Sequence, residues 1–211
     1  MSGLTGPIAP KRAGKTKKMR TNKQKMVFLG MLTLCAGRTA YPQSAADQLK
    51  QLVEISAQRL AIAGQVALAK WDSGAPVEDG SREDHVIVSV TKAGQSRGLD
   101  PTSVSNFFRA QIEANKLVQY ALLAEWRRVG KAPDHTPVDL ASTIRPELDE
   151  LDKALIAELQ KSAAIRANAS CRTDIAKAVG KYVSAHKNSL EPLNGIALDR
   201  ALATACVGPL R

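Results

Sequence analysis

Apolar residues recur every three or four positions along most of the chain after residue 44, and Ala and Leu dominate them. This spacing is the period of an amphipathic α-helix, whereas the alternating runs typical of strands are nearly absent. The stretch His85–Val90 alone is ambiguous between the two. A chain of 211 residues suits one domain with a sizeable core. The pattern predicts an all-α, single-domain bundle of about six helices, over residues 45–71, 79–95, 101–129, 146–167, 171–186 and 193–206.

The longest predicted helix is expected to lie at the centre of the bundle. Asp100 and Pro101 provide an N-cap residue followed by proline at the first helical position, which is a strong start signal. The periodic pattern then continues to Val129, a length of roughly 43 Å at about 1.5 Å per residue. A loop rich in Pro and polar residues follows over 130–137.

The formal net charge of +10 raises the question of a nucleic-acid partner. Residues 1–40 contain nine Lys or Arg and no Asp or Glu, so the remaining 21 basic and 20 acidic residues give the body a charge of only +1. A nucleic-acid binder carries its cations on the folded surface. We therefore expect no nucleic-acid partner.

The basic segment runs into a short apolar stretch, Met26–Gly37, and then into small and polar residues. This order is typical of a secretory signal peptide, and the stretch is shorter than the about 20 apolar residues of a transmembrane helix. We predict a leader over residues 1–40, cleavage between Ala36 and Ser44, and a helical domain over 44–207. The mature protein is expected in the periplasm or outside the cell, without membrane attachment.

Cysteine usage agrees with export. Cys35 leaves with the leader, so Cys171 and Cys206 remain as an even number in an oxidising compartment. We predict one disulfide between them, which would stabilise the fold by roughly 3–4 kcal/mol on the chain-entropy model. The alternative is a pair of free, buried thiols.

Two cations lie on an otherwise apolar part of the first predicted helix. Between Arg59 and Lys70 every residue is apolar or Gly except Gln65. Eleven steps of about 100° return to nearly the same direction, so Arg59 and Lys70 share one helix face, three turns apart. They are either solvated cations on an outer stripe or functional groups beside small residues that let a ligand approach.

Two amides interrupt an apolar seam on the long helix. Buried amides cost a few kcal/mol unless something bonds them. Asn115 and Gln119 therefore indicate either a polar pair that fixes helix register or a polar pocket inside the bundle. The seam consists of Phe108, Ile112, Asn115, Gln119, Leu122 and Trp126.

Further charged residues stand near helix starts. Asp79, Arg82 and Glu83 open the second predicted helix at spacings that also suit a plain surface ion pair. Arg145 precedes the fourth helix and, taken alone, is an ordinary exposed arginine.

Other chemistries lack their motifs. His85, His135 and His186 are scattered without metal-ligand spacing, and neither a Gly-rich phosphate loop nor a nucleophile elbow occurs. We expect no metal and no cofactor.

Taken in order, the singled-out residues resemble the active-site set of the all-helical chorismate mutases. The leader and the cysteine pair resemble the secreted, periplasmic class of that family, and the likeness extends over about residues 44–207. The matching residues are Arg59, Lys70, Asp79, Arg82, Glu83, Asn115, Gln119 and Arg145.

The resemblance implies an isomerase that converts chorismate to prephenate by an intramolecular [3,3] rearrangement without a cofactor. Arg59 and Arg145 would clamp the substrate carboxylates, and Arg82 would bind the ring carboxylate or hold other groups in place. Lys70 and Gln119 would donate to the ether oxygen, where negative charge grows. The four cations against two acids give +2, which suits a dicarboxylate.

The resemblance also assigns the remaining residues. Asp79 and Glu83 would take the ring hydroxyl, and Arg145 would reach the pocket of its own chain. Asn115 departs from the small hydroxyl residue usual at its position, so it counts as a substrate-binding residue whose role stays open. A homodimer is a further expectation. The competing interpretation is a periplasmic helical protein that binds a small anion without changing it.

Overall fold

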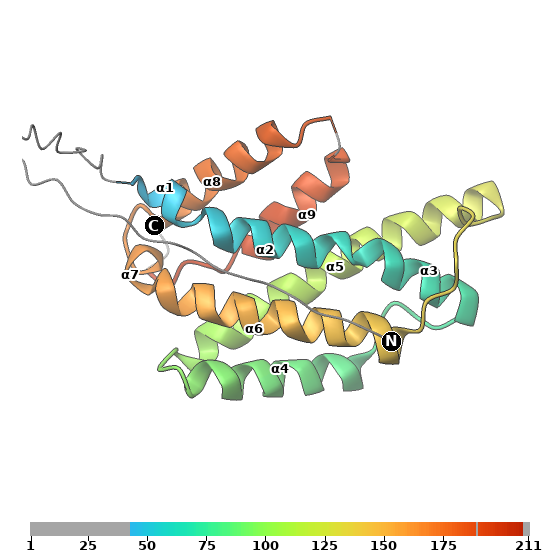
Figure 1. Cartoon of the computed structure of the whole chain (residues 1–211), viewed down its shortest axis with the longest axis horizontal. Coiled ribbons are helices and arrows are strands. Elements are labelled where there is room, and N and C mark those ends of the chain that lie inside the picture. The colour runs from blue at the N-terminus through green and yellow to red at the C-terminus, as the bar shows by residue number, and fades with distance from the viewer. Residues whose placement is uncertain (1–42, 189, 209–211) are drawn as a thin grey trace, which may run out of the picture. The chain divides into compact units, whose positions relative to one another are not determined.

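The computed structural model describes residues 43–188 and 190–208, so the leader predicted over 1–40 lies outside the described residues. Helices follow one another along this part of the chain (Figure 1). They are α1 Ala45–Gln48, α2 Lys50–Ala61, α3 Ala63–Ser73, α4 Gly80–Gln95, α5 Pro101–Val129, the π-helical turn η1 Leu140–Ile144, α6 Arg145–Lys161, α7 Ala163–Arg166, α8 Cys171–Ala185 and α9 Pro192–Leu202.

The predicted all-α class is confirmed, since no strand occurs within residues 43–188 and 190–208. The ambiguous stretch His85–Val90 is helical and belongs to α4. The single helix predicted over 45–71 is divided into α1, α2 and α3. Its dividing residues Leu49 and Ile62 keep right-handed helical backbone angles, so α2 and α3 continue end to end in Figure 1.

The long helix α5 contacts α2, α3, α4 and α9, as expected for a central element. It begins where predicted, because the Asp100 carboxylate accepts a hydrogen bond from the Ser103 backbone N–H at 2.6 Å and Pro101 fills the first helical position. It ends at Gly130, whose φ of 84° is left-handed. Phe107 and Phe108 are fully buried on α5 and meet edge to face.

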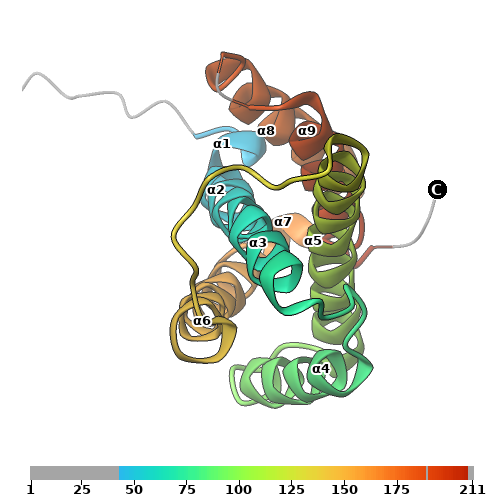
Figure 2. The same cartoon turned by 90° about the vertical axis from the view of Figure 1, so that its right-hand side faces the viewer.

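The view in Figure 2 shows how the helices around α5 are placed. The continuous helix α2–α3 runs beside α5, while α4 lies across the end of the gap between α5 and α6. Residues of α2, α3, α4, α5 and α6 line a common pocket. The hairpin of α8 and α9 lies at the other side of α2 and α5.

The predicted disulfide is confirmed, so the alternative of two free thiols is wrong. Cys171 at the start of α8 is bonded to Cys206 beyond α9, across 35 residues. The bond closes the C-terminal hairpin and restricts the unfolded chain.

The last helix ends at Leu202, four residues earlier than predicted. The reason is the buried guanidinium of Arg166, whose Nε donates to the Ala205 carbonyl at 2.7 Å. The Val207 N–H in turn donates to the Arg166 carbonyl at 3.0 Å. These bonds hold residues 205–207 beside Arg166 in a non-helical conformation, so the helix ends before them. Burial without a nearby carboxylate lowers the pKa of Arg166 to about 10.

The helical run Lys50–Ser73 is long and apolar enough to meet the length and composition of a membrane span. Sixty-one per cent of its most apolar window is buried inside the bundle, which is how a core helix of a folded domain meets the same criterion.

Gly94 lies at a close contact between α4 and α5. A Cβ atom at this position would lie 2.7 Å from Cγ2 of Val104, a stiff and fully buried side chain. Gly94→Ala should lower the free energy of unfolding by about 1–2 kcal/mol, because overpacking outweighs the gain in helix propensity. Urea denaturation measures the change.

Gly180 in α8 is the matched control, since a Cβ there meets nothing within 4 Å. Gly180→Ala should raise the free energy of unfolding by about 0.5–1 kcal/mol. Equal stability of the two variants would contradict close packing at Gly94.

Candidate active site

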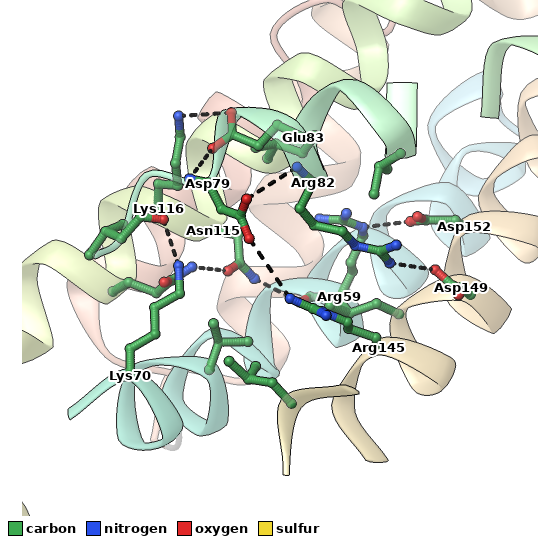
Figure 3. Close-up of a pocket in the computed structure, with 17 residues that line it drawn as sticks. Arg59, Lys70, Asp79, Arg82, Glu83, Asn115, Lys116, Arg145, Asp149 and Asp152 are labelled. Carbon is green, nitrogen blue, oxygen red and sulfur yellow. Dashed lines mark hydrogen bonds and ion pairs between the residues drawn. The ribbon is translucent and has the colours of Figure 1, made fainter. Parts of the chain in front are cut away.

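A pocket opens between α2, α3, α4, α5 and α6, and all eight residues singled out in the sequence line it (Figure 3). It is lined by Arg59, Val66, Lys70, Val77, Asp79, Arg82, Glu83, Val86, Ile112, Asn115, Lys116, Gln119, Leu140, Arg145, Leu148, Asp149 and Asp152. The apolar members form the walls, while cations, carboxylates and amides converge from five helices and the loop before α4. All these groups belong to one chain.

Arg59 and Lys70 lie on the same face of the continuous α2–α3 helix, as their spacing predicts. Arg59 is only 5% exposed, and its Nε donates to Asp152 Oδ1 at 2.7 Å. Lys70 reaches across the pocket, where its Nζ donates to the Val77 carbonyl at 2.5 Å. Burial lowers the pKa of Lys70, although the carboxylates of Asp79 and Glu83 oppose the shift.

The start of α4 holds its charged residues by local capping. The Asp79 carboxylate accepts the Arg82 backbone N–H at 3.1 Å, and Glu83 Oε1 accepts the Asp79 N–H at 3.3 Å. The reciprocal bonds resemble a capping box in which the glutamate stands one residue later. The hydrogen bond from the Arg82 N–H lowers the pKa of Asp79. Capping therefore fixes Asp79 and Glu83 at the pocket.

The two seam amides form a directed chain of hydrogen bonds. Asn115 Nδ2 donates to the backbone carbonyl of Arg59 at 3.3 Å, and Gln119 Nε2 donates to Asn115 Oδ1 at 2.7 Å. A backbone carbonyl can only accept, so it sets the orientation of Asn115 and then that of Gln119. One N–H of the Gln119 amide remains for another acceptor. Its buried Oε1 has no hydrogen-bond partner among the described residues.

Helix α6 contributes acids that sequence reasoning missed. Asp149 and Asp152 lie one and two turns after Arg145, which places all three on the pocket side of α6. The spacing i, i+4, i+7 was the only sequence signal for these acids. Charged residues on exposed helix faces show the same spacing, so the sequence did not distinguish a pocket face from a solvated face.

Each arginine of the pocket is paired with an aspartate. Beyond the buried pair of Arg59 and Asp152, Arg82 Nη2 lies 3.2 Å from Asp149 Oδ1, and Arg145 Nη2 lies 3.8 Å from Asp79 Oδ2 (Figure 3). The side chains of these two further pairs are 28–54% exposed. Water therefore weakens them, and an incoming anion can replace their aspartates.

Lys116 is a third residue of the pocket lining that the sequence did not indicate. It is 8% exposed, and its Nζ lies 2.7 Å from Glu78, 3.2 Å from Glu83 and 2.8 Å from Glu113. Desolvation opposes its charge, but the hydrogen bonds that its ammonium donates to these glutamates outweigh this effect and raise the pKa of Lys116. Its neighbour Asn115 on the seam was the only hint of its burial.

These additions change the charge balance of the pocket. Five cations face four carboxylates, so the net charge is +1 in place of the +2 expected from the eight residues: Arg59, Lys70, Arg82, Lys116 and Arg145 against Asp79, Glu83, Asp149 and Asp152. Among the described residues, no group of three or more His, Cys, Asp or Glu is placed to hold a metal ion.

Comparison with known proteins gives one consistent family. The chorismate mutase type II family model matches residues 46–120. The secreted chorismate mutase of Mycolicibacterium smegmatis is 30% identical over 168 residues, which are 78% of this chain and 91% of that protein. That of Mycobacterium tuberculosis is 28% identical over 183 residues, 85% of this chain and 88% of that protein.

Two solved structures extend the likeness to the fold. The chorismate mutase from Burkholderia phymatum has 45% identity and a TM-score of 0.73, over 77% of this chain and 98% of that one. The one from Burkholderia thailandensis has 34% identity and a TM-score of 0.71, over 75% and 99%. The fold and the pocket thus define a helical isomerase. The chain belongs to the chorismate mutase type II family.

Removing Lys116 tests the charge balance beside the pocket. Lys116→Met should lower the free energy of unfolding by about 1–2 kcal/mol, because Glu83 would keep its partly buried charge without a cation. Chemical denaturation measures it. Lys153→Met, which removes an exposed cation paired with Glu150 on α6, should leave the midpoint unchanged. Equal midpoints for both variants would contradict the role given to Lys116.

Proposed function

We propose that the pocket binds chorismate and converts it to prephenate by an intramolecular [3,3] rearrangement. The observation that carries the proposal is the convergence of Lys70 and Gln119, two donors from different helices, on one pocket that also holds three arginines. A concerted rearrangement needs no nucleophile and no proton transfer. Its rate depends on holding the substrate in its reactive chair-like fold and on stabilising the charge that develops.

The arginines account for the two carboxylates of the substrate. Arg59 presents a guanidinium that Asp152 already orients, so it suits the more deeply placed carboxylate. Arg145 and Arg82 hold their aspartates through partly exposed contacts that the other carboxylate can replace. When the substrate binds, its carboxylate thus replaces the aspartates at these two partly exposed arginines.

Lys70 and Gln119 are the proposed donors to the ether oxygen, which gains negative charge as the C–O bond breaks. An ammonium carries three N–H groups, so Lys70 can keep its bond to the Val77 carbonyl while it donates to the substrate. Gln119 uses one N–H on Asn115 and has a second one free. A preorganised donor of this kind contributes about 3–4 kcal/mol to the transition state.

Asp79 and Glu83 are proposed to accept the ring hydroxyl. Both lie at the start of α4, fixed by capping, and Lys116 neutralises part of the charge of Glu83. Asn115 is proposed to act on the substrate indirectly, by orienting the amide of Gln119. Asn115, which stands in place of the usual hydroxyl residue, thereby has a specific role.

Export and assembly complete the proposal. Relatives from two mycobacterial species carry the name secreted chorismate mutase, and the disulfide agrees with an oxidising compartment. We therefore propose that residues 1–40 are a signal peptide and that the mature protein is free of the membrane. The homodimer stays a prediction. Because a single chain lines the pocket, activity should not depend on it.

Lys70→Met tests the proposed role of Lys70 as a donor to the ether oxygen. The variant keeps the length and the apolar stem but loses the donor, so kcat should fall about 100- to 1,000-fold. The loss of chorismate absorbance with purified mature protein measures it, and circular dichroism should show unchanged helix content.

Lys92→Met is the matched control, because Lys92 is exposed on α4 away from the pocket. It should retain wild-type kcat and KM. A wild-type protein that binds the substrate without turnover would instead support an anion-binding protein.

Gln119 gives a prediction for pH. An amide donates at every pH, so the wild-type rate should stay nearly constant between mildly acidic and neutral solution. A carboxyl group donates only when protonated, so Gln119→Glu should be active at acidic pH and lose activity as pH rises through its pKa. A wild-type kcat that falls sharply across this range would argue against Gln119 as the ether donor.

A further inference from the structure

Asp152 forms the most deeply buried ion pair among the described residues. The side chains of Arg59 and Asp152 are 6% and 7% exposed, whereas each of the other pairs has at least one member that is 20% exposed or more. Desolvation offsets most of the attraction in such a pair, so it contributes little net stability. The burial of a carboxylate at this position therefore indicates a role other than stabilising the fold.

The geometry of the pair supplies that reason. Asp152 takes the Nε–H of Arg59, which occupies the side edge of the guanidinium. No described residue engages Nη1 or Nη2 of Arg59, so the end edge with its two N–H groups is left for a ligand. A guanidinium can grip a carboxylate through either edge, and the two modes place the carboxylate in different positions.

We propose that Asp152 is a positioning residue that selects the edge of Arg59 presented to the substrate carboxylate. This inference rests on the proposed function of the pocket. By closing the side edge, Asp152 permits only end-on binding and prevents the long arginine side chain from turning. The substrate carboxylate, and with it the ether bond, is then held at one distance from Lys70 and Gln119.

Two conservative substitutions separate the effect of the position of the Asp152 carboxylate from the effect of its charge. Asp152→Asn keeps an oxygen of the same reach, which will face Nε because a guanidinium only donates. Asp152→Glu keeps the charge but moves the carboxylate by one methylene. If Asp152 acts by position, Asp152→Asn should keep KM within about threefold, whereas Asp152→Glu should raise KM about tenfold or more and lower kcat, since misplacement by about 1 Å is costly.

Activity is measured by chorismate absorbance at several substrate concentrations, normalised to folded protein by circular dichroism and a thermal melt. The matched pair is Glu150→Gln and Glu150→Asp, which remove the charge or move it by one methylene. Glu150 is exposed on the same helix, pairs with Lys153 and does not line the pocket, so both of its variants should stay within about threefold of wild type.

The outcomes are distinct. Wild-type KM in Asp152→Glu with a raised KM in Asp152→Asn would show that only charge matters and would overturn the proposal. Altered melting temperatures with unchanged kcat and KM per folded molecule would show a structural role and would also overturn it. Absence of turnover in the wild-type protein would instead refute the proposed function, which separates the two failures.

Discussion

The pocket depends on one electrostatic constraint: cations gathered inside a helical bundle must find counter-charges before any substrate arrives. Arg59, Lys70 and Lys116 would be costly to bury alone. The fold meets this cost by placing carboxylates beside the arginines and Lys116 and the Val77 carbonyl beside Lys70, which leaves a net charge of +1 across the lining. The pocket is therefore attractive to a dianion and still compatible with a folded state.

The counter-charges fall into two kinds, and the difference organises the site. Asp152 is buried with Arg59 and stays in place, whereas Asp149 and Asp79 contact their arginines in partly exposed positions. A permanent pair orients its guanidinium, and an exchangeable pair yields it to an incoming carboxylate. The permanent pair belongs to the rigid, buried part of the pocket, and the exchangeable pairs belong to its partly exposed part. The amide chain from the Arg59 carbonyl through Asn115 to Gln119 also lies in the buried part.

Much of this arrangement follows from the sequence. The eleven-residue step from Arg59 to Lys70 and the amides in the α5 seam predicted groups that the structure does bring together, because helix periodicity fixes which residues share a face. The all-α class and the disulfide were equally predictable. Asp152 and Lys116 were not, because a charged residue on a helix is normally solvated, and only the packing of α6 against α2 and of α4 against α5 buries these two. The early end of α9 depends on Arg166, a contact between distant segments that local pattern does not encode.

Every described residue of the pocket lining comes from one chain, which has a consequence for where such a protein can work. A site shared between subunits dissolves when the subunits drift apart, so its output falls with the square of dilution at low concentration. When a single chain supplies the whole site, dilution lowers the concentration of sites but not the activity of each molecule. Molecules released one at a time into a large volume would each remain active, and the disulfide within each chain would keep its C-terminal hairpin closed at any dilution.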